Sequence, residues 1–212
     1  MKRFLSITNL VVWALFGLHT WLFAADLSLP TIRHQGSSLS LSLANEADHA
    51  MRQAKIWLRT NPPLVTQTQT CALVQLALGN LDASTNVMQV IELAGLASRT
   101  NQAQALLEAS LASYPPQSAD PEKLWLLSHA INQNHKGLLL RKSEVLDWRN
   151  DFAQLLLAVH RTDPAGGSYW EAPPVTNRCS EASASQPLSE PQMTARIRAT
   201  AFGLLALKEI HE

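Results

Sequence analysis

Prolines that end or block helices recur along this chain of 212 residues at intervals of about 50. They stand at Pro62-Pro63, Pro115-Pro116 and Pro164, each between two stretches in which apolar residues follow helical spacing. Proline has no N–H to donate and disfavours the helical conformation of the residue before it. Each site therefore separates one helix from the next, and the sequence predicts helices arranged in pairs.

The segments around two of these prolines are also similar in sequence. Residues 58–63 read LRTNPP and precede CALVQLAL at 71–78, whereas residues 160–164 read HRTDP and precede TAFGLLAL at 200–207. A repeat period of this length is typical of helical hairpins that bury their apolar faces only by stacking on neighbours. We therefore expect an all-α fold of stacked helical hairpins.

The helical segments differ in how much of their surface is apolar. Residues 71–78 and 200–207 are apolar nearly all round, which predicts helices that are covered on most sides. Residues 143–159 carry an apolar stripe typical of an amphipathic helix, and Asp120 with Pro121 predicts the start of another. Alternating apolar runs of strand length are missing, so we expect no sheet.

The first 25 residues have the three parts of a secretory signal. Lys2 and Arg3 are followed by a mostly apolar run over 10–23 and by the small residues Ala24 and Ala25. The apolar run is shorter than the roughly 20 residues that a membrane-spanning helix needs. The sequence predicts a cleaved signal and export to the periplasm or medium; the alternative is an uncleaved N-terminal anchor.

The rest of the chain divides into two parts, the second of which contains a long loop. Residues 26–43 read as an extended leader, 44–212 as a helical hairpin domain, and 171–193, rich in Pro, Ser, Ala and Glu, as a long loop within it. Without Lys2 and Arg3 this remainder has 15 basic and 17 acidic residues, against 17 and 17 in the whole chain. Nucleic-acid binding requires a clear basic excess, so we expect no such partner and, after signal cleavage, no membrane contact.

The third repeat resembles the α/α-toroid superfamily, which includes terpene cyclases and protein prenyltransferase β subunits. Its inner helix, of the type Thr-Ala-x-x-Leu-Leu-Ala-Leu, matches residues 200–207. Its turn, of the type Asp-Gly-Gly-x-aromatic, matches Asp163, Gly166, Gly167 and Tyr169 or Trp170. The resemblance implies a partial toroid with an outer helix, a turn and an inner helix. Residues matching the acidic, zinc or thioester motifs of these families are missing from the chain.

Asp163, Gly166 and Gly167 are best explained by backbone geometry. Glycine allows a positive φ, and aspartate can accept a hydrogen bond from its own backbone two residues on. The neighbouring Tyr169, Trp170 and Glu171 form the strongest candidate binding site, because a carboxylate beside aromatic rings is common in sugar sites.

The cysteines and histidines suggest few other sites. In an oxidising compartment Cys71 and Cys179 can form a disulfide; the alternative is that Cys71 is a buried free thiol. His129 and His135 are six residues apart, which does not place them on one helical face, so we expect no metal site. We expect His160 at a helix C-terminus, where the dipole favours an imidazolium.

Other candidates and the function class complete the prediction. Glu144, Asp147 and Asp151 would share one helical face, either as an acidic site or as a solvated surface. We expect no cofactor. The leading hypothesis is an exported, non-catalytic binding or assembly module with a protein partner or self-association. The alternatives are a small secreted enzyme acting on polysaccharide or isoprenoid, and a truncated relic of a larger toroid.

Overall fold

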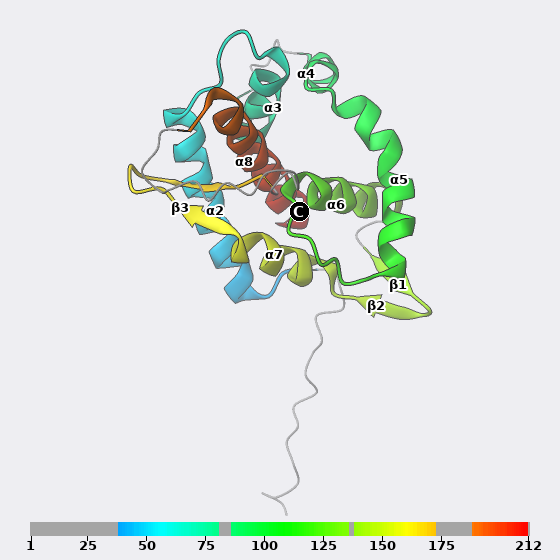
Figure 1. The fold of residues 1–212 in the computed structure, drawn as a ribbon. Helices are drawn as coiled ribbons and strands as arrows, with labels where there is room; N and C mark the ends of the chain where they lie inside the picture. Colours follow the sequence, from blue (N-terminus) through cyan, green and yellow to red (C-terminus); the bar gives the residue numbers. More distant parts are fainter. Residues whose placement is uncertain (1–37, 81–85, 136–137, 173–187, 212) are drawn as a thin grey trace, which may run out of the picture. The chain divides into compact units, whose positions relative to one another are not determined.

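The computed structural model describes residues 38–80, 86–135, 138–172 and 188–211, without the side chains of residues 100, 101 and 135. All of these lie in the compact unit His34–Glu212. This part of the chain is mostly helical, as predicted, and also contains short strands (Figure 1). The helices are α2 (Leu41–Thr60), α3 (Thr68–Leu78), α4 (Val87–Leu93), α5 (Leu96–Ala112), α6 (Pro121–His135), α7 (Trp148–Ala158) and α8 (Glu190–His211). The strands are β1 (Leu139–Arg141), β2 (Glu144–Leu146), β3 (His160–Thr162) and β4 (Ser168–Trp170).

Helix α8 lies at the centre of this unit (Figure 1). It contacts α2, α3, α6, α7 and β4. Residues 200–207 are buried apart from Leu205, which is half-buried. A helix with no polar face must be covered on most sides. The prediction that this segment lies inside, with other helices around it, is therefore confirmed.

A closed series of contacts runs through α3, α4, α5, α6 and α8 (Figure 1). Helix α3 contacts α4, α4 contacts α5, α5 contacts α6, and α8 closes the series because it contacts both α6 and α3. Helices α2 and α7 also pack against α8 and contact each other. The main contacts of α2 are thus with α8, α7 and β4, whereas the sequence repeat pairs this helix with α3.

The helix starts follow local capping chemistry. Asp120 accepts a hydrogen bond from the Glu122 amide at 3.0 Å, and Pro121 is the first residue of α6, as predicted. Helix α2 begins at Leu41, with the Ser40 hydroxyl accepting from the Leu43 amide at 3.4 Å. It therefore starts inside the stretch 26–43 that was predicted as a leader.

A β-hairpin occupies the start of the helix predicted over 143–159. Strand β1 pairs antiparallel with β2, with Leu140 opposite Val145. The turn residues Lys142 and Ser143 have φ values of 48° and 71°, which a right-handed helix cannot contain. Helix α7 therefore begins only at Trp148, and the expectation of a fold without strands is wrong.

The predicted acidic face is wrong for the same reason. Glu144 lies in β2, and Asp147 is the residue that precedes α7. The Asp147 carboxylate accepts hydrogen bonds from the Asn150 side chain at 2.7 and 2.9 Å, and Asp151 accepts one from the Tyr114 hydroxyl. These carboxylates therefore have separate partners and do not form one acidic cluster.

The second β-hairpin follows α7 in the sequence, and a tight turn joins its two strands. The Asp163 amide donates to the Gly167 carbonyl at 3.0 Å, and the Asp163 carboxylate accepts from the Ala165 amide at 2.8 Å. Gly166 and Gly167 have φ values of 109° and 82°, which favour glycine. Asp163, Gly166 and Gly167 thus lie where the backbone needs their particular properties.

This turn is also fixed to α2, which the sequence did not indicate. Asp163 accepts a hydrogen bond from the Trp57 indole N–H at 2.6 Å. A Cβ at Gly167 would lie 2.8 Å from the Trp57 backbone nitrogen and 2.9 Å from the Gln53 carbonyl oxygen. The turn therefore touches the backbone of α2 directly, and glycine at 167 is required for this contact as well as for its φ.

Strand β4 is held against α8 by its last residue. Trp170 is fully buried, and its indole N–H donates to the Leu156 carbonyl at 2.8 Å. The Thr200 hydroxyl accepts from the Trp170 amide at 3.2 Å. A Cβ at Gly203 would lie 2.6 Å from the Trp170 ring, so the small residue on α8 makes room for the indole.

Several predictions concern residues outside the described part. The signal over 1–25 and Cys179 are among them, as is most of the loop 171–193, although α8 already begins at Glu190. Of the described helices, none combines the length and apolar character needed to cross a membrane.

Candidate binding groove

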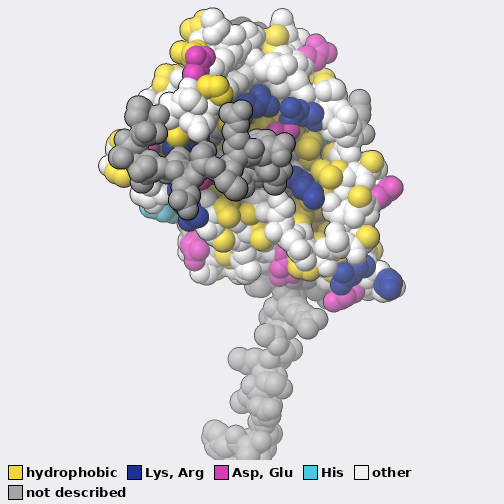
Figure 2. Space-filling model, in the orientation of Figure 1, with side chains coloured by type: hydrophobic (Ala, Val, Ile, Leu, Met, Phe, Trp, Pro, Cys, Tyr) yellow, Lys and Arg dark blue, Asp and Glu magenta, His cyan; other side chains and the backbone are white. Residues whose placement is uncertain are grey.

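Three adjoining open cavities, which we call together the groove, are lined by α8 and α6, by α5 and α6, and by α8 with Gln67, the residue before α3. The first has a volume of 160 Å³ and shares Asp120 and Glu122 with the second, of 530 Å³. The third, also of 530 Å³, shares Ala195 and Arg198 with the first. In Figure 2 basic side chains border a hollow with hydrophobic side chains in its walls, in the area between α8 and α5.

The apolar walls of the groove come from three helices. Helix α5 supplies Ala105 and Leu106, α6 supplies Leu126, and α8 supplies Ala199 and Phe202. These helices are held together by apolar packing around Leu107 and Leu124, which are buried. Side chains of the wall therefore sit on rigid elements rather than on loops, which suits a surface that binds in one fixed geometry.

Two arginines face the same aromatic ring of this wall. The guanidinium carbons of Arg99 and Arg198 lie 5.9 and 5.8 Å from the centroid of the Phe202 ring, within the range of cation–π attraction. Burial lowers the pKa of both arginines, and the positive charge of Arg198 lowers that of Arg99 further. Both remain charged near neutral pH, so two cations share a partly desolvated place.

The carboxylates of the groove already have partners within the chain. Glu122 forms an ion pair with Arg99, and Asp120 caps α6. In the described part of the chain, no hydrogen bond or ion pair engages the guanidinium of Arg198 or the ammonium of Lys123. The lining of the groove therefore combines the cations Arg198 and Lys123 with the carboxylates of Asp120, Glu122 and Glu190.

The third cavity adds a buried acceptor beside Arg198. The Gln67 side-chain nitrogen donates to the Thr194 hydroxyl at 2.8 Å and to Glu190 at 3.4 Å. The Gln67 side-chain oxygen is buried and has no hydrogen-bond partner among the described residues.

The residues that sequence reasoning chose as a binding site lie elsewhere. Trp170 is fully buried against α8 and is part of the core. Tyr169 packs between the Trp57 ring, at 5.4 Å between centroids, and the Arg196 guanidinium, 4.2 Å from its ring. Glu171 is exposed and pairs with Arg196 at 2.9 Å. The structure thus brings Tyr169 and Glu171 to one arginine, whereas Trp170 faces the opposite way.

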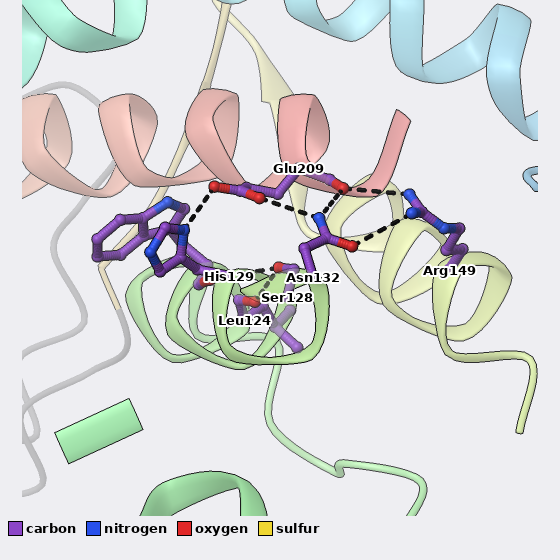
Figure 3. Close-up of polar contacts among 7 residues, drawn as sticks. Leu124, Ser128, His129, Asn132, Arg149 and Glu209 are labelled. Carbon is purple, nitrogen blue, oxygen red and sulfur yellow. Dashed lines mark hydrogen bonds and ion pairs between the residues drawn. The ribbon is translucent and has the colours of Figure 1, made fainter. Parts of the chain in front are cut away.

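A polar network joins α6, α7 and α8 at the end of α8 (Figure 3). Glu209 pairs with His129 at 2.8 Å and accepts from the Asn132 side chain at 3.0 Å. Arg149 donates to the backbone carbonyls of Glu209, at 3.1 Å, and of Ile210. A cation that donates to the last carbonyls of a helix satisfies its unpaired acceptors.

The charges in this network favour the ionised form of Glu209. Burial acts to raise the pKa of Glu209, but hydrogen bonds from His129 and Asn132, together with nearby His129 and Arg149, lower it overall. All four side chains bond to one another or to the backbone of α8. We therefore interpret the network as structural, since it satisfies groups that packing would otherwise leave buried and unpaired.

His160 lies in a β-strand, and not at a helix end as predicted. Helix α7 ends at Ala158, and the His160 ring is 2.6 Å from the Ser168 hydroxyl and 5.2 Å from the Trp170 ring. Burial, followed by the nearby His49 and Arg161, lowers the pKa of His160. The neutral imidazole is thus favoured, contrary to the expectation of an imidazolium.

Two further sequence predictions concern metals and cysteines. Among the described residues, no group of three or more His, Cys, Asp or Glu side chains is arranged to hold a metal ion. The Cys71 thiol lies 3.3 Å from the Leu64 carbonyl oxygen. Because Cys179 is outside the described residues, the disulfide stays a prediction.

The sequence did not predict a binding site at the groove. The one available signal was Arg198, a charge close to the apolar stretch 200–207 of a central helix. Arg99 and Phe202 carry no motif, and only the fold brings them together. No family model matches the chain, and neither the curated proteins nor the solved structures contain a match.

Proposed function

We propose that this protein is a non-catalytic binding module that holds a segment of a partner protein in the groove. The observation that carries the proposal is Arg198, a half-buried cation without a carboxylate partner in the described part of the chain, beside Phe202 in an open, apolar-walled groove. Mixed apolar and charged grooves on rigid helices are suited to peptide segments, whose side chains alternate in character.

Export is part of the same proposal. The basic, apolar and small-residue pattern of residues 1–25 supports a cleaved secretory signal, with an N-terminal anchor as the alternative. A partner would then be met outside the cytoplasm. Export would also allow Cys71 and Cys179 to pair.

We also propose that α7, the β3–β4 turn and α8 together form one hairpin repeat of the α/α-toroid type. The support is the order of outer helix, turn and inner helix, with Asp163, Gly166 and Gly167 in the turn. The stacking of three such repeats is proposed from the sequence pattern alone, and the main contacts of α2, with α8, α7 and β4, depart from the pairing of α2 with α3 that the repeat predicts.

We base the function on the groove and not on Glu171. An enzyme acting on polysaccharide would need a second carboxylate or a histidine beside Glu171. Among the described residues, Glu171 pairs with the cation Arg196. The groove therefore gives the stronger basis for an experiment.

Photo-crosslinking at the groove tests this function. The exposed Ala105 lies in the groove wall, and the exposed Gln154 lies on α7, outside it. With benzoyl-phenylalanine at position 105 in cells that express the chain, we expect one crosslinked protein that is missing with the same residue at position 154. Crosslinking that is equal at both positions, or missing at both, would contradict the proposal. A crosslink between two copies would instead indicate self-association.

A size measurement of the purified protein complements this. The proposal expects the protein to migrate with its partner when the two are mixed. Loss of compactness on adding reductant, in the protein with both cysteines but not in Cys71→Ser, would establish the predicted disulfide.

A further inference from the structure

We infer that the segment held in the groove has no net charge and carries basic and acidic side chains in alternating order, complementary to the order of charges along the groove. This rests on the proposed function and adds the chemical class of the partner segment. The order of the charges, their lack of partners within the chain and their spacing along α8 support it.

The three cavities follow one another along the groove, which fixes the order of its charges. The third and first cavities share Arg198, whereas the first and second share Asp120 and Glu122. The third and second cavities have no lining residue in common, so they form the two ends. Glu190 lines the end at the third cavity, and Lys123 lines the end at the second. The charges from end to end are therefore negative, positive, negative and positive.

These charges are available to a partner. In the part of the chain that the structure describes, no ion pair engages either cation of the series, the carboxylate of Glu190 or that of Asp120. Between the two cations, Glu122 is neutralised by its ion pair with Arg99, whereas Asp120 uses one carboxylate oxygen to cap α6. Asp120 therefore supplies the negative charge at this position.

Two of the charges lie on one face of α8 at a known spacing. Glu190 and Arg198 are separated by slightly more than two helical turns, which is about 12 Å along the helix axis. An extended peptide covers this distance in about four residues, at roughly 3.3 Å per residue. A basic side chain followed four positions later by an acidic one can therefore reach both.

The apolar wall gives the order of charges its weight. Arg198 is half-buried beside Phe202, and Leu106 and Leu126 line the second cavity. Water screens such partly buried charges less than charges on an open surface. A segment that packs its apolar side chains against this wall would bring its own charges next to those of the groove, where like charges repel. Complementarity therefore selects the order of the charges and not an excess of one sign.

Two peptides of identical composition test the inference. In the first, two lysines and two glutamates alternate at every fourth position, with leucine after each and serine elsewhere; in the second, both lysines precede both glutamates. Both peptides are acetylated and amidated, and binding is followed by backbone amide chemical shifts of the ¹⁵N-labelled protein. We expect the alternating peptide to bind roughly tenfold more tightly, because in one of its two directions it matches every charge of the groove, whereas the block order matches half of them in either direction.

A charge exchange at the two ends of the groove should invert this preference. Glu190→Lys combined with Lys123→Glu keeps the net charge and makes the order of the lining positive, positive, negative and negative, which the second peptide matches. The control combines Glu46→Lys with Arg59→Glu, at two exposed positions of α2 outside the groove, and should keep the wild-type preference. If the first double variant does not fold, Glu190→Lys alone, at an exposed position, should make the two peptides bind equally.

Several outcomes would overturn the inference. These are equal binding of the two peptides by the wild-type protein, no binding of either, and a preference that survives the charge exchange. Tighter binding of a peptide in which every lysine is replaced by glutamate would also reject it, because net charge would then decide.

The failure of this inference can be told from failure of the proposed function. A partner that crosslinks at position 105 while the alternating peptide shows no advantage would keep the function and reject the alternating order. If nothing crosslinks at position 105, the proposed function itself fails.

Discussion

Two β-hairpins flank α7, and each has two strands of three residues. The β3–β4 hairpin inserts Trp170 into the core and places Gly167 against the backbone of α2. The β1–β2 hairpin buries Leu139 and Leu146 and leaves Leu140 and Val145 exposed by 57% and 40%. Both hairpins therefore reach the core, but the β3–β4 hairpin also touches the backbone of α2 through its turn.

Truncating the anchor of β4 should have the largest effect. Trp170→Ala removes a fully buried indole and its hydrogen bond to Leu156. We expect the free energy of unfolding to fall by about 4 kcal/mol, measured by urea denaturation. An exposed control in the other hairpin is Leu140→Ala, which should cost little because that side chain is 57% exposed. Equal losses in the two variants would show that the hairpins do not differ as described.

Substitutions of the two glycines in the β3–β4 turn separate the cost of backbone strain from the cost of a clash with α2. Gly167→Ala should destabilise the protein by about 3 kcal/mol, since the new Cβ meets the backbone of α2 and the φ is unfavourable. Gly166→Ala has the same φ problem but no atom within 4 Å of the new Cβ, so it should cost about 1 kcal/mol. Thermal unfolding of both variants measures the difference. Equal losses would mean that contact with α2 adds nothing.

The hydrogen bond between the turn and α2 is expected to contribute less. Asp163→Ala removes the acceptor of the Trp57 indole N–H and of the Ala165 amide, at a cost of about 2 kcal/mol. Asp163→Asn keeps an acceptor and should cost less. Indole N–H exchange at Trp57, followed by NMR, reports directly on the bond. Unchanged protection of that N–H in Asp163→Ala would refute this assignment.

The smallest change is expected in the β1–β2 turn, and with the opposite sign. Ser143 has a φ of 71°, a conformation that costs an L-residue about 1 kcal/mol and glycine nothing. Ser143→Gly should therefore raise the free energy of unfolding by about 0.5 kcal/mol, because part of the gain is offset by entropy of the unfolded chain. Destabilisation in urea denaturation would mean that the Ser143 side chain makes a contact worth more than the strain.

The parts of the fold that the sequence predicted are those fixed by local chemistry. The start of α6 follows from Asp120 and Pro121, and the interior place of α8 follows from its apolar stretch 200–207. The β3–β4 turn was indicated by Asp163 and its glycines. In each case, neighbouring residues alone determine the backbone or its burial.

The parts that the sequence did not predict depend on distant contacts or on strained backbone. Lys142 and Ser143 adopt positive φ, although turns of this kind usually contain glycine or asparagine at such positions. The sequence therefore contains no signal for the β1–β2 hairpin. The groove depends on contacts between distant helices, such as the one between Arg99 of α5 and the Phe202 ring of α8. Trp170 was wrongly predicted as a binding residue. Aromatic side chains occur both in binding sites and in hydrophobic cores, and the neighbouring residues in the sequence do not distinguish these two roles.

The position of α8 has a consequence for how the chain folds. This helix follows every other described helix in the sequence, yet α2, α3, α6 and α7 all pack on it. While the ribosome has made only the residues before 190, those helices lack the surface that buries their apolar sides. Their contacts join residues far apart in sequence, which slows folding. The chain should therefore stay unfolded and protease-sensitive through most of its synthesis.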